Sequence, residues 1–288
     1  MPAREASSGP LPSWVSSAAS IVGPASVLGA LGFYFGYVSS RSQYEYFGID
    51  VDTIGLSTQD YVMRSPQPLL VPLLALTLLG VGLLVTHSAV RRGIARPKRA
   101  AALRHAVRGA SAAGLAVLAT GVALLFGYSA ARAVPAYNLV TPLLLSLGAG
   151  LVGYASHIRV QLGGPRRAGT ILLYVVVAAG VFWATATVAQ WSGRGQATDA
   201  ARHMDQLPRV ILDTRERLYL RDPGVEETSL PAAEGQTFHY RYRHLRLLIV
   251  GHDRMFLVPD TWSASNSTLV VPLDGSVRVQ FQFQNQHP

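Results

Sequence analysis

Three histidines and two aspartates near the C-terminus are the side chains best suited to chemistry, namely His239, His244, His252, Asp253 and Asp260. Imidazole and carboxylate groups together are common ligands of zinc. A metal site needs convergent ligands, and this spacing matches no metal-binding or catalytic signature. We therefore interpret the histidines as solvent-facing strand residues, and we predict no catalytic residue, no metal site and no cofactor.

The chain contains no cysteine and only a loose group of serines. The lack of cysteine excludes disulfides, thiolate metal sites and cysteine nucleophiles. Ser263, Ser265 and Ser267 lie in a polar loop without the glycine pattern of a nucleophile elbow. These observations favour a protein that is not an enzyme. An outer-surface hydrolase or transferase that uses His252 and Asp253 is the alternative.

The segment of residues 39–68 gathers several of the few acids in the chain, namely Glu45, Asp50, Asp52 and Asp60. A calcium loop would need oxygen ligands at closer, regular spacing with a turn glycine. Ser57, three residues before Asp60, predicts a capping box at the start of a short helix. We interpret this segment as a structured cap that meets the C-terminal domain, with an outward cation or ligand site as the alternative.

The helices expected to carry these segments lie in a long stretch of the chain that has no acidic side chains. Residues 61–198 contain neither aspartate nor glutamate, and only basic charges separate their apolar runs. A water-soluble helix needs a charged face, whereas about 20 apolar residues cross the hydrocarbon of a bilayer. The predicted spans are residues 18–37, 69–90, 110–131, 139–156 and 170–190.

The first apolar run has two interpretations, a cleaved signal peptide or a retained span. Its N-terminal flank carries Glu5 as well as Arg4, and no clear cleavage site follows it. Trp14 at one end and Tyr34 and Tyr37 at the other are typical of aromatic anchors at membrane interfaces. We therefore expect a retained span.

Basic residues set the expected orientation. They cluster in two loops, one with Arg91, Arg92, Arg96, Lys98, Arg99, Arg104 and Arg108, the other with Arg159, Arg166 and Arg167. Two spans separate these loops, so both lie on one side, which the positive-inside rule makes cytoplasmic. There they set topology or contact anionic lipid headgroups. Residues 1–17 then form a cytoplasmic tail, and the chain after residue 191 is extracytoplasmic.

Glycines within the spans indicate close helix packing. The first span carries Gly32 and Gly36, the second carries Gly80 and Gly82, and the fourth carries Gly148, Gly150 and Gly153. Small residues let helix backbones approach one another where lipid removes the hydrophobic drive for association. Packing within one bundle is the plainer interpretation, and homo-oligomerisation is the alternative.

After a linker at residues 192–208, alternation at period two predicts a small, mostly antiparallel β domain over residues 209–288. Expected strands cover residues 209–213, 217–221, 238–242, 245–250, 254–258, 268–271 and 277–283. The predicted fold is therefore a membrane α-helical bundle of five transmembrane helices plus this C-terminal domain.

Two groups of side chains are candidates for a partner surface. Arg241, Arg243 and Arg246 could form a basic strip on one face of a strand, suited to an anionic polymer or headgroup. Tyr44, Tyr46 and Phe47 follow the first span and would sit naturally at headgroup level. A solvated strand face balanced by nearby glutamates is the plainer interpretation of the arginines.

Several segments carry a resemblance. YEYFGID at residues 44–50, STQDY at 57–61, YRYRHLRLL at 240–248 and FLVP at 256–259 resemble uncharacterised actinobacterial multi-pass membrane proteins. The resemblance implies a similar arrangement of spans and outer domain. It implies no known activity, so it assigns no functional residue.

The formal net charge is +9, but residues 197–288 hold ten arginines against eleven acids. The excess therefore lies beside the spans, which points to lipid and not to nucleic acid. We predict a non-enzymatic protein of a bacterial plasma membrane whose extracytoplasmic β domain binds or senses a partner. Expected partners are the lipid bilayer and a second copy or another membrane protein. An oligomeric channel or transport component is a further alternative.

Overall fold

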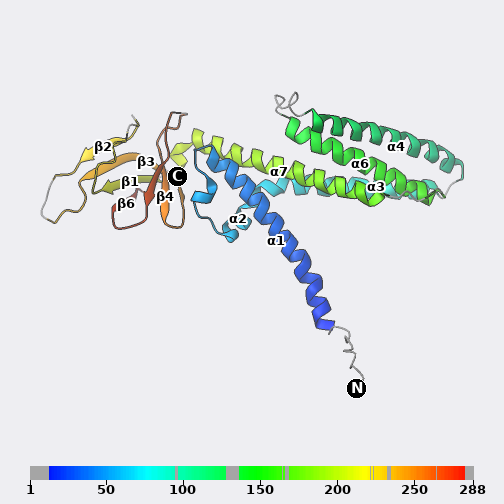
Figure 1. The fold of residues 1–288 in the computed structure, drawn as a ribbon, viewed down its shortest axis with the longest axis horizontal. Helices are drawn as coiled ribbons and strands as arrows, with labels where there is room; N and C mark the ends of the chain where they lie inside the picture. The colour runs from blue at the N-terminus through cyan, green and yellow to red at the C-terminus, as the bar shows by residue number, and fades with distance from the viewer. Residues whose placement is uncertain are drawn as a thin grey trace, which may run out of the picture.

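A computed structural model describes residues 13–94, 97–127, 136–163, 165, 169–220, 222, 224–231, 235–263 and 265–282. In the helix that begins at residue 13 the side chains are described from residue 23, and in the helix that begins at residue 97 they are described from residue 102. The molecule is elongated, with a helical bundle at one end and a β-sheet at the other (Figure 1). The first helix runs at an angle to the bundle and meets it beside the sheet (Figure 1).

The helices are long and follow one another with short connections. Their bounds are α1 (Ser13–Glu45), η1 (Val51–Thr53), α2 (Thr58–Arg64), α3 (Pro66–Ile94), α4 (Pro97–Phe126), α6 (Tyr137–Gln161), α7 (Thr170–Arg202) and η2 (Met204–Gln206). The capping box expected at the start of α2 is present, since the Ser57 hydroxyl accepts from the Asp60 amide and the Asp60 carboxylate accepts from the Ser57 amide.

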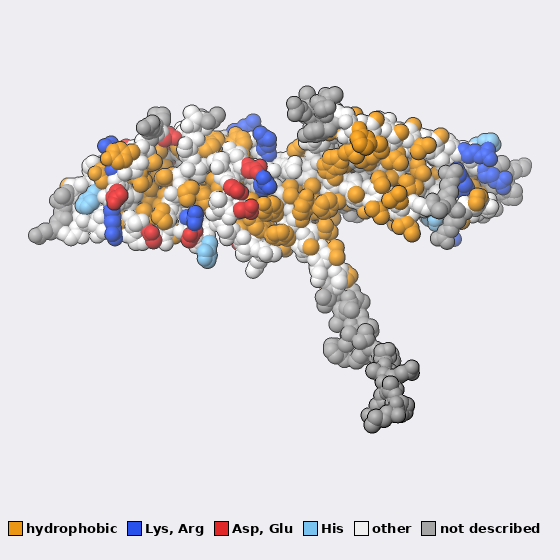
Figure 2. Space-filling view, viewed as in Figure 1, with side chains coloured by type: hydrophobic (Ala, Val, Ile, Leu, Met, Phe, Trp, Pro, Cys, Tyr) orange, Lys and Arg blue, Asp and Glu red, His pale blue; other side chains and the backbone are white. Residues whose placement is uncertain are grey.

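Within the described residues, four helical segments are long and apolar enough to cross a membrane, namely Pro66–Ile94, Ala102–Phe126, Tyr137–Gln161 and Thr170–Arg202. The molecule is therefore a membrane protein with a helical bundle and a β-sheet. Hydrophobic side chains cover the visible face of the bundle, whereas charges of both signs are scattered over the sheet (Figure 2). The expected span at residues 18–37 lies within α1, and residues 128–131 of the third expected span lie outside the described part.

The bundle packs through backbone contacts at small residues. A Cβ added to Gly148 would lie 2.5 Å from the Leu118 amide nitrogen of α4, and one added to Gly180 of α7 would lie 2.8 Å from the Pro142 carbonyl oxygen. α7 continues from the bundle to Arg202 without a break. It crosses α1 so closely that a Cβ at Gly193 would lie 2.0 Å from the carbonyl oxygen of Ser39.

The C-terminal domain is one antiparallel sheet. Its strands are β1 (Arg209–Thr214), β2 (Glu226–Ser229), β3 (Tyr240–Val250), β4 (Arg254–Pro259), β5 (Leu269–Pro272) and β6 (Val277–Gln282). The path through the sheet is β5-β4-β3-β1-β6, and β2 also pairs with β3. β3 joins two expected strands into one, with a bulge where Arg243 and His244 both lie opposite Ile211 of β1.

Two details of the strand prediction are wrong. Residues 217–220 form no strand; instead Leu218 donates its amide to the Tyr242 hydroxyl at 2.7 Å and the segment covers one face of the sheet. β2 was not expected, because the polar sequence Glu-Glu-Thr-Ser lacks the apolar alternation that indicates a half-buried strand. It pairs through its backbone with β3 and stays largely exposed.

Both faces of the sheet are buried at β4. Met255 and Leu257 face one cluster with Val210, Leu212 and Tyr242 on the far side of the sheet. Phe256 and Val258 face a second cluster that also contains side chains from the membrane-proximal helices and the segment between α1 and α2. A strand that is buried on both faces reads as a continuous apolar run, which explains the sequence Met-Phe-Leu-Val.

Candidate functional site

The second cluster forms a joint between the sheet and the helices. We use "joint" for its buried residues Tyr44, Phe47, Ile49, Val51, Ile54, Tyr61, Ala197, Met204, Ile249, Phe256 and Val258. They come from the end of α1, the segment between α1 and α2, α2 itself, the last turns of α7, η2 and the strands β3 and β4. Tyr44 and Phe47, expected at headgroup level, are 3% and 2% exposed in the joint, whereas Tyr46 is 36% exposed.

Hydrogen bonds fix the cap segment to the sheet. The Thr268 hydroxyl donates to the Phe47 carbonyl oxygen at 2.7 Å, and the His252 amide donates to the Ile54 carbonyl oxygen at 3.2 Å. Gly251 is needed at the second contact, because a Cβ there would lie 2.2 Å from the same Ile54 oxygen. The turn between β3 and β4 therefore sits directly on the cap.

Arg246 fastens η2, which follows α7, to the same sheet. Its side chain is 5% exposed and pairs with the carboxylate of Asp260. Its Nη1 donates to the carbonyl oxygens of Asp205 at 3.2 Å and Leu207 at 2.9 Å. Burial alone raises the pKa of Asp260, but hydrogen bonds from His244 and Arg246 outweigh it, so this pKa lies below its ordinary value. Arg246 is thus held inside the protein.

A second ion-pair group crosses three strands. Asp213 is fully buried, and its carboxylate accepts from Arg241 of β3 at 2.8 Å and from Arg278 of β6 at 2.6 Å. Burial raises the pKa of Asp213, but the two guanidinium groups outweigh burial and leave the pKa below its ordinary value. Of the three arginines predicted as a basic strip, Arg243 is the exposed one, and it lies opposite Glu226.

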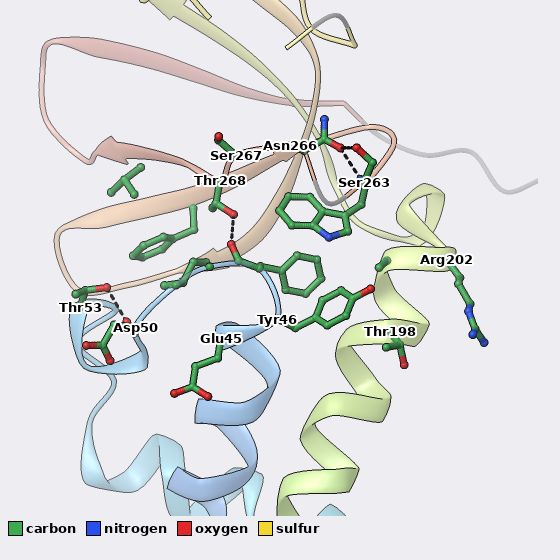
Figure 3. A pocket seen from close by; sticks show the side chains of 17 residues that line it. Glu45, Tyr46, Asp50, Thr53, Thr198, Arg202, Ser263, Asn266, Ser267 and Thr268 are labelled. Atoms are coloured by element: carbon green, nitrogen blue, oxygen red, sulfur yellow. Dashed lines mark hydrogen bonds between the residues drawn. The ribbon is translucent and has the colours of Figure 1, made fainter. Parts of the chain in front are cut away.

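A cleft of about 1010 Å³ opens beside the joint, and Figure 3 shows it at close range. Its lining comes from the cap, α7 and the segment from β4 to β5, namely Glu45, Tyr46, Phe47, Gly48, Ile49, Asp50, Thr53, Thr198, Ala201, Arg202, Phe256, Trp262, Ser263, Asn266, Ser267, Thr268 and Val270. The ring of Tyr46 points across the cleft toward α7, whereas the side chains of Arg202 and Glu45 point away (Figure 3).

The inward-facing groups of the cleft are aromatic or uncharged. Trp262 contacts Phe47 edge-to-face, with ring centroids 5.0 Å apart. Several hydroxyls are already engaged, for example that of Ser263 with Asn266. Within the described part of the chain, neither the Tyr46 hydroxyl nor the Trp262 indole N–H has a hydrogen-bond partner. An aromatic surface with free donors suits an uncharged ligand that is rich in hydroxyl groups.

The residues first considered for chemistry do not converge. His252 lies on the cap at Gly55, and Asp253 forms a bidentate ion pair with its neighbour Arg254. His244 lies between Asp260 and Glu226, at 3.1 and 3.5 Å from their carboxylates. In the residues that the structure describes, no group of three or more histidine, aspartate and glutamate side chains is arranged to hold a metal ion.

Most of the predicted packing glycines lie at contacts within the chain, whereas a Cβ added to Gly80 or Gly82 would meet no atom within 4 Å. A Cβ at Gly36 would lie 1.9 Å from the Tyr61 carbonyl oxygen of α2, and a Cβ at Gly32 would lie 3.2 Å from the Ser65 hydroxyl oxygen. Gly148 meets α4, and Gly150 and Gly153 face α7. Several other glycines also pack closely against neighbouring atoms, but sequence reasoning did not identify them because they stand alone and form no paired motif. They are Gly114, Gly121, Gly180, Gly193 and Gly251.

The predicted topology arginines gather away from the sheet. Arg91 and Arg92 end α3, Arg104 and Arg108 lie near the start of α4, and Arg159 lies near the end of α6. Blue side chains, which are arginines in the described part, are visible at the end of the bundle that is farthest from the sheet (Figure 2). Arg96, Arg166 and Arg167 lie outside the described residues, as do the side chains of Lys98 and Arg99.

Fold and contacts together define an integral membrane protein whose helices share a buried joint with a β-sheet. Comparison with protein family models, with curated proteins and with solved structures finds no match. The resemblance seen in the sequence therefore stays a prediction, and function is argued below from the geometry alone.

Proposed function

We propose that the chain is a five-span protein of a bacterial plasma membrane, with its N-terminus in the cytoplasm and its sheet on the extracytoplasmic side. α1 supplies the fifth span. The support is the distribution of charge along the molecule, since the described arginines of α3, α4 and α6 lie at the end of the bundle farthest from the sheet (Figure 2), whereas the acids of the helices and the cap lie at the sheet end. Retention of arginine on the cytoplasmic side is the main determinant of orientation in such proteins.

The absence of native cysteine makes this topology directly testable. Glu216→Cys would place a thiol on an exposed position of the β domain, and His105→Cys would place one on the exposed N-terminal part of α4. In intact cells, a membrane-impermeant maleimide should label the Glu216→Cys protein and should label the His105→Cys protein only after lysis. The reverse pattern would overturn the orientation.

The function that the geometry supports best is binding, without catalysis, of an uncharged polyhydroxylated ligand such as a segment of an envelope glycan. The observation that carries the proposal is the pair of unengaged donors, Tyr46 hydroxyl and Trp262 indole N–H, in one aromatic cleft. The flanking charged side chains of Glu45 and Arg202 point away from the cleft (Figure 3), which disfavours a strongly charged ligand.

The position of the cleft explains how binding could be sensed. A ligand there would contact the cap that follows α1, the end of α7 and the segment that joins β4 to β5 at the same time. The channel alternative loses part of its support, because the Gly32 and Gly36 pair packs against α2 of the same chain. The hydrolase alternative is disfavoured, because both carboxylate oxygens of Asp253 accept from the guanidinium group of Arg254.

Tryptophan fluorescence tests this proposal on the full chain. The protein has four tryptophans, so replacing Trp14, Trp183 and Trp191 with phenylalanine leaves Trp262 as the reporter. Titration with chitotriose and maltotriose, two uncharged saccharide probes, should change its emission saturably. Trp262→Phe in the native background should weaken calorimetrically measured binding about tenfold, the loss of one good hydrogen bond.

An aromatic side chain remote from the cleft provides the control. Tyr219, 72% exposed, packs under Arg217 with its ring centroid 5.0 Å from the guanidinium carbon and does not line the cleft. Tyr219→Phe should leave binding unchanged. Unaltered emission of Trp262 with both saccharides at millimolar concentration would refute a saccharide as the ligand.

A further inference from the structure

A second groove lies at the outer end of the bundle, between α1, α7 and the start of α6. Its volume is about 780 Å³, and Tyr34, Arg41, Asn138, Gln190, Trp191 and Arg194 belong to its lining. The apolar run of α7 ends where this groove begins, since Gln190 and Trp191 directly follow residues 170–189. The groove therefore lies at the membrane boundary, below the cleft described above.

Both α1 and α7 present at least one aromatic residue and one arginine to the groove. On α1, Tyr34 lies about two turns before Arg41, and on α7, Trp191 lies one turn before Arg194. Aromatic rings favour the level of the headgroups, and a guanidinium just beyond that level meets the phosphate of a lipid. Arg41 and Arg194 thus both lie just beyond the point where Ser39 of α1 meets Gly193 of α7, whereas Tyr34 lies deeper, beside Phe182.

Of the two arginines in the groove, only Arg41 forms an ion pair within the described part of the protein. Arg41 donates from Nε to the Glu45 carboxylate at 2.6 Å, and Tyr37 also lies close to its guanidinium group. Arg194 is exposed and has no partner within the described part of the chain. Together with Glu45, the two arginines leave one excess positive charge, which a monoanionic phosphodiester would neutralise.

The helices also leave room for acyl chains. Tyr34 contacts Phe182 of α7 with ring centroids 4.9 Å apart. Toward its N-terminus α1 then diverges from α7 (Figure 1), and Val27 and Leu28 are 59% and 69% exposed. A lipid whose phosphate sits between the arginines would thus have apolar helix surface below it.

We propose that this groove binds the headgroup of an anionic phospholipid of the phosphatidylglycerol class. The guanidinium groups of Arg194 and Arg41 contact the phosphate, the amides of Asn138 and Gln190 are placed to bond the glycerol hydroxyls, and Trp191 covers the upper part of the acyl chains. Such a contact holds α1 beside α7 at the level where the two helices begin to separate. The inference goes beyond ligand binding in the cleft and does not depend on it.

Quenching of Trp191 by brominated lipids tests the assignment. The full chain with Trp14, Trp183 and Trp262 replaced by phenylalanine is placed in bilayers that contain either brominated phosphatidylglycerol or brominated phosphatidylcholine. Phosphatidylglycerol should quench more strongly at equal mole fraction. Arg194→Gln should lower the relative association constant about fivefold, the factor expected for one basic group at a membrane surface.

Arg202 provides a matched control on the same helix. Arg202→Gln removes the same charge eight residues farther along α7, about 12 Å beyond the groove, and should change the association constant less than twofold. Equal quenching by the two lipids, or equal losses for both variants, would overturn the proposal.

A third arm separates a lipid from a soluble phosphate ester. Glycerol 1-phosphate at 10-fold excess over the lipid should leave quenching by phosphatidylglycerol in detergent micelles unchanged. If glycerol phosphate displaces the lipid, the groove is a site for soluble phosphates and the lipid assignment is wrong. Since Trp262 reports on the cleft and Trp191 on the groove, either proposal can fail while the other stands.

Discussion

Replacement of Phe47 by alanine should release the sheet from the helices. Phe47 is 2% exposed, contacts Trp262 edge-on at 5.0 Å and carries the carbonyl that accepts from Thr268. Truncation of a buried phenylalanine destabilises a protein by about 3–5 kcal/mol. If the joint opens as a local unit, 3 kcal/mol raises its opened population roughly 150-fold.

Hydrogen exchange measured by mass spectrometry on the protein in nanodiscs can read this opening. The slowest backbone amides of β4, which packs one face on the joint, should exchange about 100-fold faster in the Phe47→Ala protein. Tyr46→Ala is the matched control, because Tyr46 is adjacent in sequence but 36% exposed, and its exchange should rise less than tenfold. Unchanged protection of β4 after Phe47→Ala would show that the sheet is stable without the joint and would refute the reasoning.

Three further predictions concern the helices, the ion pairs and the boundaries of the β domain. Gly36→Ala inserts a Cβ 1.9 Å from the Tyr61 carbonyl oxygen and should lower stability by about 1–3 kcal/mol in thermal unfolding, whereas Gly80→Ala meets no atom within 4 Å and should not. Since the folded-state pKa of Asp213 is depressed, its stabilisation is present above the unfolded pKa of about 3.9 and is lost as pH falls through the folded value. Asp213→Asn should therefore flatten the acid branch of sheet unfolding followed by circular dichroism. Residues 209–288 expressed alone should bind a hydrophobic dye strongly, because Ile249, Phe256 and Val258 lose their partners; a monomeric fragment that does not bind the dye would contradict the shared core.

Local patterns in the sequence predicted the parts of the fold that depend on local physics. The long acid-free stretch indicated helices without a water-facing side, and four of them meet the length and apolarity of a membrane span. The Ser57 and Asp60 pair predicted the capping box of α2. Alternation located most of the strands, although it could not show the bulge that joins two of them into β3.

The joint and the cleft could not be predicted, because their contacts are distant in sequence. Thr268 bonds to Phe47 across 221 residues, and nothing in either local sequence indicates the other. The aromatic residues after α1 carry the same signal whether they face lipid headgroups or a protein interior, so Tyr44 and Phe47 were expected at the membrane surface. Likewise, a basic alternation in β3 does not reveal that Asp213 and Asp260 bind two of its arginines.

The arrangement couples the two proposed sites through the end of α1. Glu45 and Tyr46 line both the cleft and the groove, so one short segment borders the proposed saccharide site on one side and the proposed lipid site on the other. Just before it, Ser39 of α1 touches Gly193 of α7 with no space for a side chain, which fixes where the helices cross. A ligand that shifts Tyr46 can therefore alter the groove without sliding the helices past one another. Linkage requires the effect to be reciprocal: a saccharide that raises the affinity for phosphatidylglycerol must itself bind more tightly when that lipid is present.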